Sequence, residues 1–153
     1  DDLLAQCDWV VASIHLAMGP GGSGKLSPTE RTLAAIENRW ISTIGHPTGR
    51  LINRRRAMEM DMAQIVAAAA QNGTLLEINA SWQRLDLKDL HARQALDAGV
   101  MLVIDTDAHH PEQLGQMHFG VSTARRAGAK KKEVANTFAL ANLKKTIKTK
   151  RQA

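Results

Sequence analysis

Polar side chains that can bind a metal ion recur where short apolar runs of this sequence end. His15 follows an apolar run at residues 9–14, and His46 follows a run at residues 40–44. Asp107 and His109 come just after a run at residues 100–104. Imidazole and carboxylate ligands together suit zinc, manganese or iron. With one residue between them, Asp107 and His109 can leave an extended loop on the same side and serve one ion or two neighbouring ions.

The other three histidines carry weaker signals. His91 lies in an expected helix among polar residues, which indicates a surface position. His110 should point away from its neighbour His109, and His118 has no visible partner in the sequence. A lone histidine is more often a hydrogen-bonded structural residue than a ligand. The prediction of a site therefore depends on the whole set of residues at successive strand ends.

Arginines follow His46 closely, at position 50 and in a run at positions 54–56. A guanidinium beside a metal site suits phosphate because its N–H groups match phosphate oxygens in pairs. We therefore expect Arg50 to contact phosphate, with a solvated loop as the alternative. For residues 54–56 the sequence leaves both interpretations open.

The apolar runs alternate with helical patterns, which predicts βα units, a parallel sheet and an α/β fold. The runs lie at residues 9–14, 40–44, 74–78 and 100–104. Because parallel strands end at one edge of a sheet, the polar residues that follow them should converge there.

Helix signals separate these runs. The strongest start has Ser27 as N-cap, Pro28 in the first turn and Glu30 completing a capping box, for a helix that reaches about residue 38. Further helices are expected from Asp61 to Gly73, from Asp86 or Asp89 to Gly99, near residue 111, and over residues 130–148. The glycine-rich residues 19–24 predict a loop.

The composition predicts an aliphatic core, since hydrophobic residues make up 44% of the chain and aromatic residues 3%. The single cysteine, Cys7, cannot form an internal disulfide, and we expect a buried apolar residue in a cytoplasmic protein. No signal peptide is recognised, and no apolar stretch approaches the ~20 residues that span a bilayer, so no membrane contact is expected. The sequence does not begin with Met, which is consistent with a piece of a longer protein.

The net charge of +5 is concentrated near the C-terminus. Residues 125–151 contain ten Lys and Arg residues and one acidic residue, Glu133. Such a basic end beside a slightly acidic body favours contact with a polyanion such as nucleic acid. A solubilising, partly disordered tail is the alternative, and composition does not decide between the two.

Six short strings of residues stand out in chain order: VVASIH (10–15), IGHPTGR (44–50), LEIN (76–79), RLDL (84–87), DTDAH (105–109) and GVSTARR (120–126). Together they resemble the PHP (polymerase and histidinol phosphatase) domain, in particular its C-terminal part in bacterial family X DNA polymerases. The His-x-His strand that opens a complete PHP domain has no counterpart. The resemblance thus implies a partial PHP domain over residues 1–153, with residues 127–153 as a basic helical end.

The resemblance implies a fold, a metal site and an activity. The fold would be the C-terminal part of a distorted seven-stranded TIM-like barrel. His15, His46, Asp107 and His109 would be metal ligands for Mn²⁺ or Zn²⁺, with up to three ions in a complete domain, and Asp107 and His109 would be catalytic. Glu77 and Asn79 are not expected to be ligands.

The implied function is a metal-dependent phosphoesterase with 3′–5′ exonuclease and 3′-end processing activity in DNA repair. Its partners would be DNA 3′ ends and a polymerase portion of the same polypeptide, with Arg50, Arg125 and Arg126 as DNA contacts. One alternative is a small-molecule phosphatase like histidinol phosphatase. Another is a non-catalytic module that keeps the fold and binds DNA or a polymerase.

Overall fold

The computed structural model describes residues 1–15 and 26–152, and the glycine-rich loop predicted at residues 19–24 lies outside them. The protein is an α/β structure around a four-stranded sheet, in which the strands follow the order β1-β2-β3-β4 and every neighbouring pair is parallel. The strands are β1 (Val11–Ala12), β2 (Thr43–Ile44), β3 (Leu75–Asn79) and β4 (Leu102–Asp105). The predicted α/β fold with parallel βα units is confirmed.

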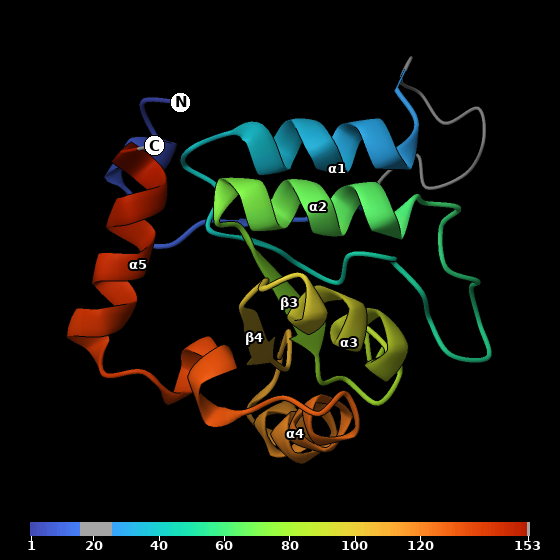
Figure 1. Ribbon diagram of the computed structural model, residues 1–153. Coiled ribbons are helices and arrows are strands. Elements are labelled where there is room, and N and C mark those ends of the chain that lie inside the picture. Colours follow the sequence, from blue (N-terminus) through green and yellow to red (C-terminus); the bar gives the residue numbers. More distant parts are fainter. Residues whose placement is uncertain (16–25, 153) are drawn as a thin grey trace.

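Helices connect successive strands and cover the sheet. They are α1 (Pro28–Glu37), α2 (Met62–Asn72), α3 (Asp89–Asp97), α4 (Met117–Arg126) and α5 (Leu140–Gln152). In Figure 1, α1 and α2 lie side by side above the strands, and α4 lies below β3 and β4. None of the helices in the described part of the chain is long and apolar enough to cross a membrane.

The core is aliphatic, as the composition predicts. Leu76, Ile78 and Leu102 of the sheet are fully buried, and Ile36 of α1 and Ile65 of α2 pack against them. Aliphatic side chains of this kind each stabilise a fold by about 1.5–3 kcal/mol when buried. The core fixes the register of the strands, and thereby the positions of the residues at their ends.

Two helix starts follow the predicted capping chemistry. Ser27 Oγ accepts a hydrogen bond from the backbone N–H of Glu30, and the Glu30 carboxylate accepts one from the N–H of Ser27. Asp61 caps α2, which ends at Gly73 in the left-handed conformation. The N-cap predicted for the third helix is wrong. Lys88, and not Asp86 or Asp89, is the N-cap of α3, and Asp86 is buried before the helix begins.

The segment after β4 departs from the predicted pattern. The helix expected near residue 111 is a 3₁₀ turn, η2 (Pro111–Gln116), that continues into α4. The single helix expected over residues 130–148 is wrong, because the turns η3 (Lys131–Glu133) and η4 (Ala135–Thr137) precede α5. The cause is a docking contact, in which the Asn136 side chain bonds both the N–H and the carbonyl of Ile104, each at 2.7 Å.

The two ends of the chain meet beside α1 and α2 (Figure 1). Cys7 is exposed rather than buried, because it follows the peripheral 3₁₀ turn η1 (Leu4–Gln6), which has no buried residue. The Arg151 side chain donates a hydrogen bond to the Cys7 carbonyl at 2.7 Å. The basic end is thus docked on the body at Arg151.

Candidate functional site

The ends of β1 and β2 bring two of the predicted ligands together. The rings of His15 and His46 meet edge to face, with centroids 5.0 Å apart and an angle of 76° between the ring planes. Parallel pairing of Ala12 with Ile44 sets this contact, because each histidine follows its strand by two or three residues. His15 is exposed and His46 is buried, so one ring of the pair is open to solvent and the other lies inside the protein.

The loop after β4 places Asp107 near the same group. The Asp107 carboxylate lies 3.7 Å from Nε of Arg84 and accepts a weak hydrogen bond from the Asn79 amide at 3.4 Å. Its backbone is left-handed and is fixed by a hydrogen bond from its N–H to the Asp105 carboxylate at 3.0 Å. Asn79 and Asp105 end neighbouring strands, so the register of β3 and β4 positions Asp107.

The protonation of His46 suits metal binding. Burial lowers the pKa of His46, and the nearby Arg84 cation lowers it further, whereas Asp107 acts in the opposite direction. The ring is therefore neutral near pH 7, which is the form that binds metals. Its Nδ1 atom is buried and has no hydrogen-bond partner among the residues described. A buried polar atom left without a partner costs about 1–3 kcal/mol, so this nitrogen fits a ligand from outside the chain.

His109 lies on the exposed part of the loop. Its Nδ1 atom is 2.7 Å from the Asp107 carbonyl, and its backbone N–H donates to Gln113 at 2.6 Å. If Nδ1 carries the proton for that contact, Nε2 is left free as a ligand atom. Within residues 1–15 and 26–152, however, no three His, Cys, Asp or Glu side chains are arranged to hold a metal ion. The arrangement is a histidine pair with a neighbouring carboxylate and not a closed coordination shell.

Two buried carboxylates support the loop of His46 from beneath. The Glu77 carboxylate accepts a hydrogen bond from the backbone N–H of His46. Burial, followed by a hydrogen bond and repulsion from Asp105, raises the pKa of Glu77 to about 10. Burial therefore favours the neutral form of the Glu77 carboxyl, and the expectation that Glu77 is not a ligand stays a prediction.

Asp86 holds the next residues of the same loop. Its carboxylate accepts a hydrogen bond from the backbone N–H of Thr48 at 3.0 Å, and the residue is fully buried. Burial raises the pKa of Asp86, while its bonds to Thr48 and the nearby Arg50 oppose that shift. Arg50 itself donates to the backbone carbonyls of Arg84, at 2.7 Å, and Leu85. Arg50 therefore braces two loops against each other, and its Nε and Nη2 groups are not free for the predicted phosphate contact.

Arg84 is the residue that sequence reasoning missed. Its Nε faces Asp107, its side chain is largely buried, and its Nη1 atom has no partner in the described parts of the chain. Only its place in the string RLDL, two residues before the buried Asp86, marked it in the sequence. A guanidinium with an unpaired N–H group beside a histidine pair can bind an anionic oxygen.

The other predicted phosphate contacts lie elsewhere. Arg125 and Arg126 are at the C-terminal end of α4, about 12 Å along the helix from its start beside β4. Arg126 pairs with Asp89 at 3.0 Å on the surface. The structure therefore does not bring Arg125 and Arg126 to the histidines.

The remaining histidines are also outside the site. His91 is half-buried rather than on the surface, because α4 packs beside its helix α3, and burial lowers its pKa. His110 is exposed at the start of η2, and His118 is exposed on α4, with Nδ1 2.7 Å from the Gly115 carbonyl.

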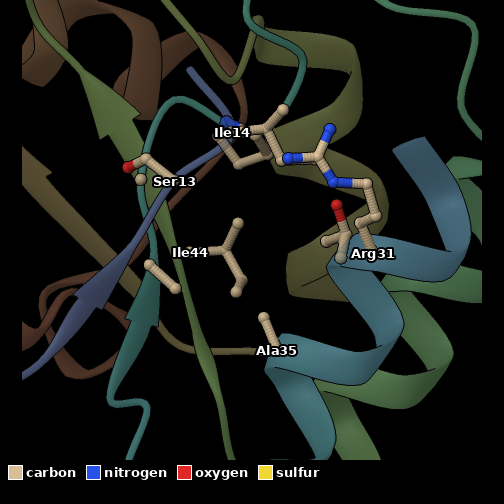
Figure 2. A pocket seen from close by; sticks show the side chains of 9 residues that line it. Ser13, Ile14, Arg31, Ala35 and Ile44 are labelled. Atoms are coloured by element: carbon tan, nitrogen blue, oxygen red, sulfur yellow. The ribbon is translucent and has the colours of Figure 1, made fainter. Parts of the chain in front are cut away.

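A cavity of about 140 Å³ adjoins the histidine pair, between the ends of β1 and β2 and the helix α1. Figure 2 shows the Arg31 side chain reaching from α1 toward Ile14, with Ala35 and Ile44 at the other end of the hollow. A Cβ on Gly45 would lie 2.6 Å from Oγ of Ser13, so the strands approach closely there. The close approach brings His15 near His46.

In open α/β proteins, ligands bind at the carboxyl ends of the parallel strands, and this chain has histidine, carboxylate and guanidinium groups at that edge. No model of a known protein family matches the chain. The chain is 40% identical over 148 residues to the DNA polymerase/3′-5′ exonuclease PolX of Bacillus subtilis strain 168, which is 97% of this chain and 25% of PolX.

Probable phosphatases are also similar to the chain. One from Thermoanaerobacter sp. strain X514 is 25% identical over 158 residues, covering 99% of this chain and 62% of the phosphatase. One from Shewanella sp. strain ANA-3 is 30% identical over 148 residues, covering 93% and 56% respectively. The chain thus spans a quarter of PolX and about three fifths of these two phosphatases. The predicted resemblance is confirmed: the chain is similar to a part of PolX and to probable phosphatases, which is consistent with a PHP-like segment.

Proposed function

We propose that this chain is part of a metal-dependent phosphodiesterase that processes DNA 3′ ends in a longer polypeptide with a polymerase portion. The observation that carries the proposal is the contact between the His15 and His46 rings at one edge of the sheet, with Asp107 close enough to act on the pKa of His46 and with Nδ1 of His46 buried and unpaired among the described residues. The relatives, one named as an exonuclease and the others as probable phosphatases, support phosphoester chemistry.

The residues of the site would bind metal, bind phosphate or hold the loops in position. His15, His46, Asp107 and His109 would hold Mn²⁺ or Zn²⁺, to which imidazole and carboxylate ligands are suited. A bound ion would polarise a phosphoryl oxygen and lower the pKa of a bound water. Arg84 would donate its unpaired Nη1–H group to a phosphate oxygen. Its ion pair with Asp107 would weaken, because the Asp107 carboxylate would also bind the metal ion. Glu77 and Asp86 would keep the His46 loop in place through its backbone.

The proposal also covers the complete domain to which this chain would belong. The four-stranded sheet would be the C-terminal part of a seven-stranded TIM-like barrel, whose other strands would add ligands for up to three ions. The incomplete coordination shell within the described residues is consistent with such a division. A role in DNA repair and a cytoplasmic location stay predictions.

Two other functions remain as outcomes of the test. A small-molecule phosphatase is favoured by the larger share of the phosphatases that the chain covers, and PolX is favoured by the higher identity. A non-catalytic module that binds DNA or a polymerase is favoured by the open coordination shell.

The test uses the full polypeptide that carries this segment and compares Asp107→Asn with Glu112→Gln. Both changes remove one exposed carboxylate from the segment after β4, but only Asp107 faces Arg84. With added Mn²⁺, Asp107→Asn should lower 3′-exonuclease turnover by about 100-fold or more, as loss of a group that acts on the transition state does, and leave polymerisation unchanged. Glu112→Gln should leave both rates unchanged. Full exonuclease activity in Asp107→Asn would overturn the proposal, and hydrolysis of small monoesters alone would favour the phosphatase.

A further inference from the structure

The loop after His46 forms a defined hairpin. The backbone groups of Leu51 and Arg55 exchange hydrogen bonds at 2.9 and 2.8 Å, and Asn53 at the turn has a left-handed φ of 61°. Asparagine tolerates that conformation better than most residues. The hairpin borders an open hollow of about 510 Å³ lined by residues 50–57, which include four arginines and no acidic residue.

The four arginines divide into two pairs. Arg50 and Arg55 are used within the chain, since Arg55 donates through Nε and Nη2 to the Gly49 carbonyl at 2.9 and 2.6 Å. The side chains of Arg54 and Arg56 are exposed and have no hydrogen bond or ion pair with any described residue. The Arg55 guanidinium is thus used within the chain, whereas the side chains of its two neighbours face solvent.

The hairpin is tied directly to the candidate site. The N–H of Ile52 donates to the Gln83 carbonyl at 2.7 Å, and the next residue, Arg84, faces Asp107. At its other end, the N–H of Gly49 donates to the His46 carbonyl at 2.9 Å. Figure 1 shows the segment between β2 and α2 extending away from the sheet, at the right of the view in teal to green. The free arginines therefore lie beyond the site and not within it.

We propose that Arg54 and Arg56 bind the phosphodiester backbone of a nucleic-acid strand whose end occupies the site. The inference depends on the proposed function for the chemistry at that end. Unpaired guanidinium groups are strong phosphate donors, and these two face no carboxylate across the hollow that would compete with phosphate. Arg50 and Arg55 are positioning residues that hold the hairpin against the His46 loop.

The substrate class follows from the position of the two free arginines. A small phosphate ester fills the strand-end site and does not extend to the hairpin, so Arg54 and Arg56 contribute nothing to its binding. A strand of several nucleotides extends from the site and carries a phosphate at each step. The hairpin therefore selects polynucleotides over small esters.

The binding test measures the affinity of the full chain for a fluorescent single-stranded oligothymidylate over a range of salt concentrations. Arg54→Gln/Arg56→Gln is compared with Arg54→Lys/Arg56→Lys, which keeps both positive charges at the same exposed positions. Two lost phosphate contacts should reduce the slope of log K against log salt by about 1.4, because each contact on a single strand contributes about 0.7. The lysine variant should leave the slope unchanged. An unchanged slope in the glutamine variant, or an equal loss in both variants, would overturn the inference.

Hydrolysis separates this inference from the proposed function. With Mn²⁺ and the full polypeptide, the glutamine variant should raise KM for the oligonucleotide and leave hydrolysis of bis(p-nitrophenyl) phosphate as in wild type. An equal loss on both substrates would mean that the hairpin supports the site itself, which contradicts the inference. If wild type hydrolyses neither substrate, the proposed function fails, whereas the salt slope still decides whether the hairpin binds nucleic acid.

Discussion

Lys150 of α5 buries its ammonium group between the C-terminal ends of α1 and α2. Its Nζ donates to the Thr74 hydroxyl at 2.7 Å and to the carbonyls of Ile36 at 3.1 Å and Asn72 at 3.4 Å. Helix C-termini carry partial negative charge, which favours a cation there. Only 8% of Lys150 is exposed, and burial lowers its pKa from 10.5 to about 8.

This shift predicts how stability depends on pH. Between pH 8 and 10.5 the unfolded chain keeps the Lys150 proton and the folded chain has lost it, so the free energy of unfolding rises with pH. A pKa change from 10.5 to about 8 corresponds to at most about 3 kcal/mol over that window. Below pH 8 both states are protonated and Lys150 contributes no pH dependence.

The assay is urea unfolding of wild type, Lys150→Met and Lys148→Met at several pH values from 7 to 10.5. Methionine keeps the apolar stem and removes the charge, and Lys148 is an exposed lysine of the same helix. The stability of wild type relative to Lys150→Met should increase by up to about 3 kcal/mol between pH 8 and 10.5. Relative to Lys148→Met it should stay constant. Parallel pH profiles for wild type and Lys150→Met would refute the reasoning.

Two further predictions concern packing. A Cβ on Gly120 would lie 2.5 Å from Cγ2 of Ile104 and 2.7 Å from Cβ of Ala80, so Gly120→Ala should destabilise the fold by about 1–3 kcal/mol in urea unfolding, whereas Gly115→Ala, with nothing within 4 Å, should be tolerated. Deletion of residues 139–153 should lower the melting temperature in calorimetry, because Lys150 and Ile147 are buried against the body, and an unchanged melting temperature would show that α5 is only a solvated tail.

Local chemistry made much of the fold predictable from the sequence. The capping box of Ser27 and Glu30 and the glycine stop at Gly73 depend on residues within one or two turns, and the structure has both. Strand positions followed from apolar runs, although β1 and β2 are shorter than the runs that contain them. The break before α5 depends on Asn136 reaching Ile104, a contact that spans 32 residues and leaves no local pattern.

The candidate site was less predictable. The convergence of strand-end residues follows from parallel topology, which alternating elements indicate. Arg50 and Asp86 bond backbone groups of other loops, and Arg84 faces the carboxylate of Asp107, so none of these contacts leaves a local pattern in the sequence. The sequence offered one clue, since Glu77 and Asp86 are acids set among aliphatic residues, and buried acids of this kind need specific partners.

The central claim is that His15, His46 and His109 act as metal ligands, and long-range ¹H–¹⁵N spectra of the six imidazoles test it most directly. During titration with Zn²⁺, ring nitrogens of these three residues should shift as coordination begins, with weak affinity because the shell within the described residues is incomplete. His91 and His118 should not shift, and Asp107→Asn should weaken the response of the three. Shifts spread evenly over all six rings, or confined to His91 and His118, would contradict the claim.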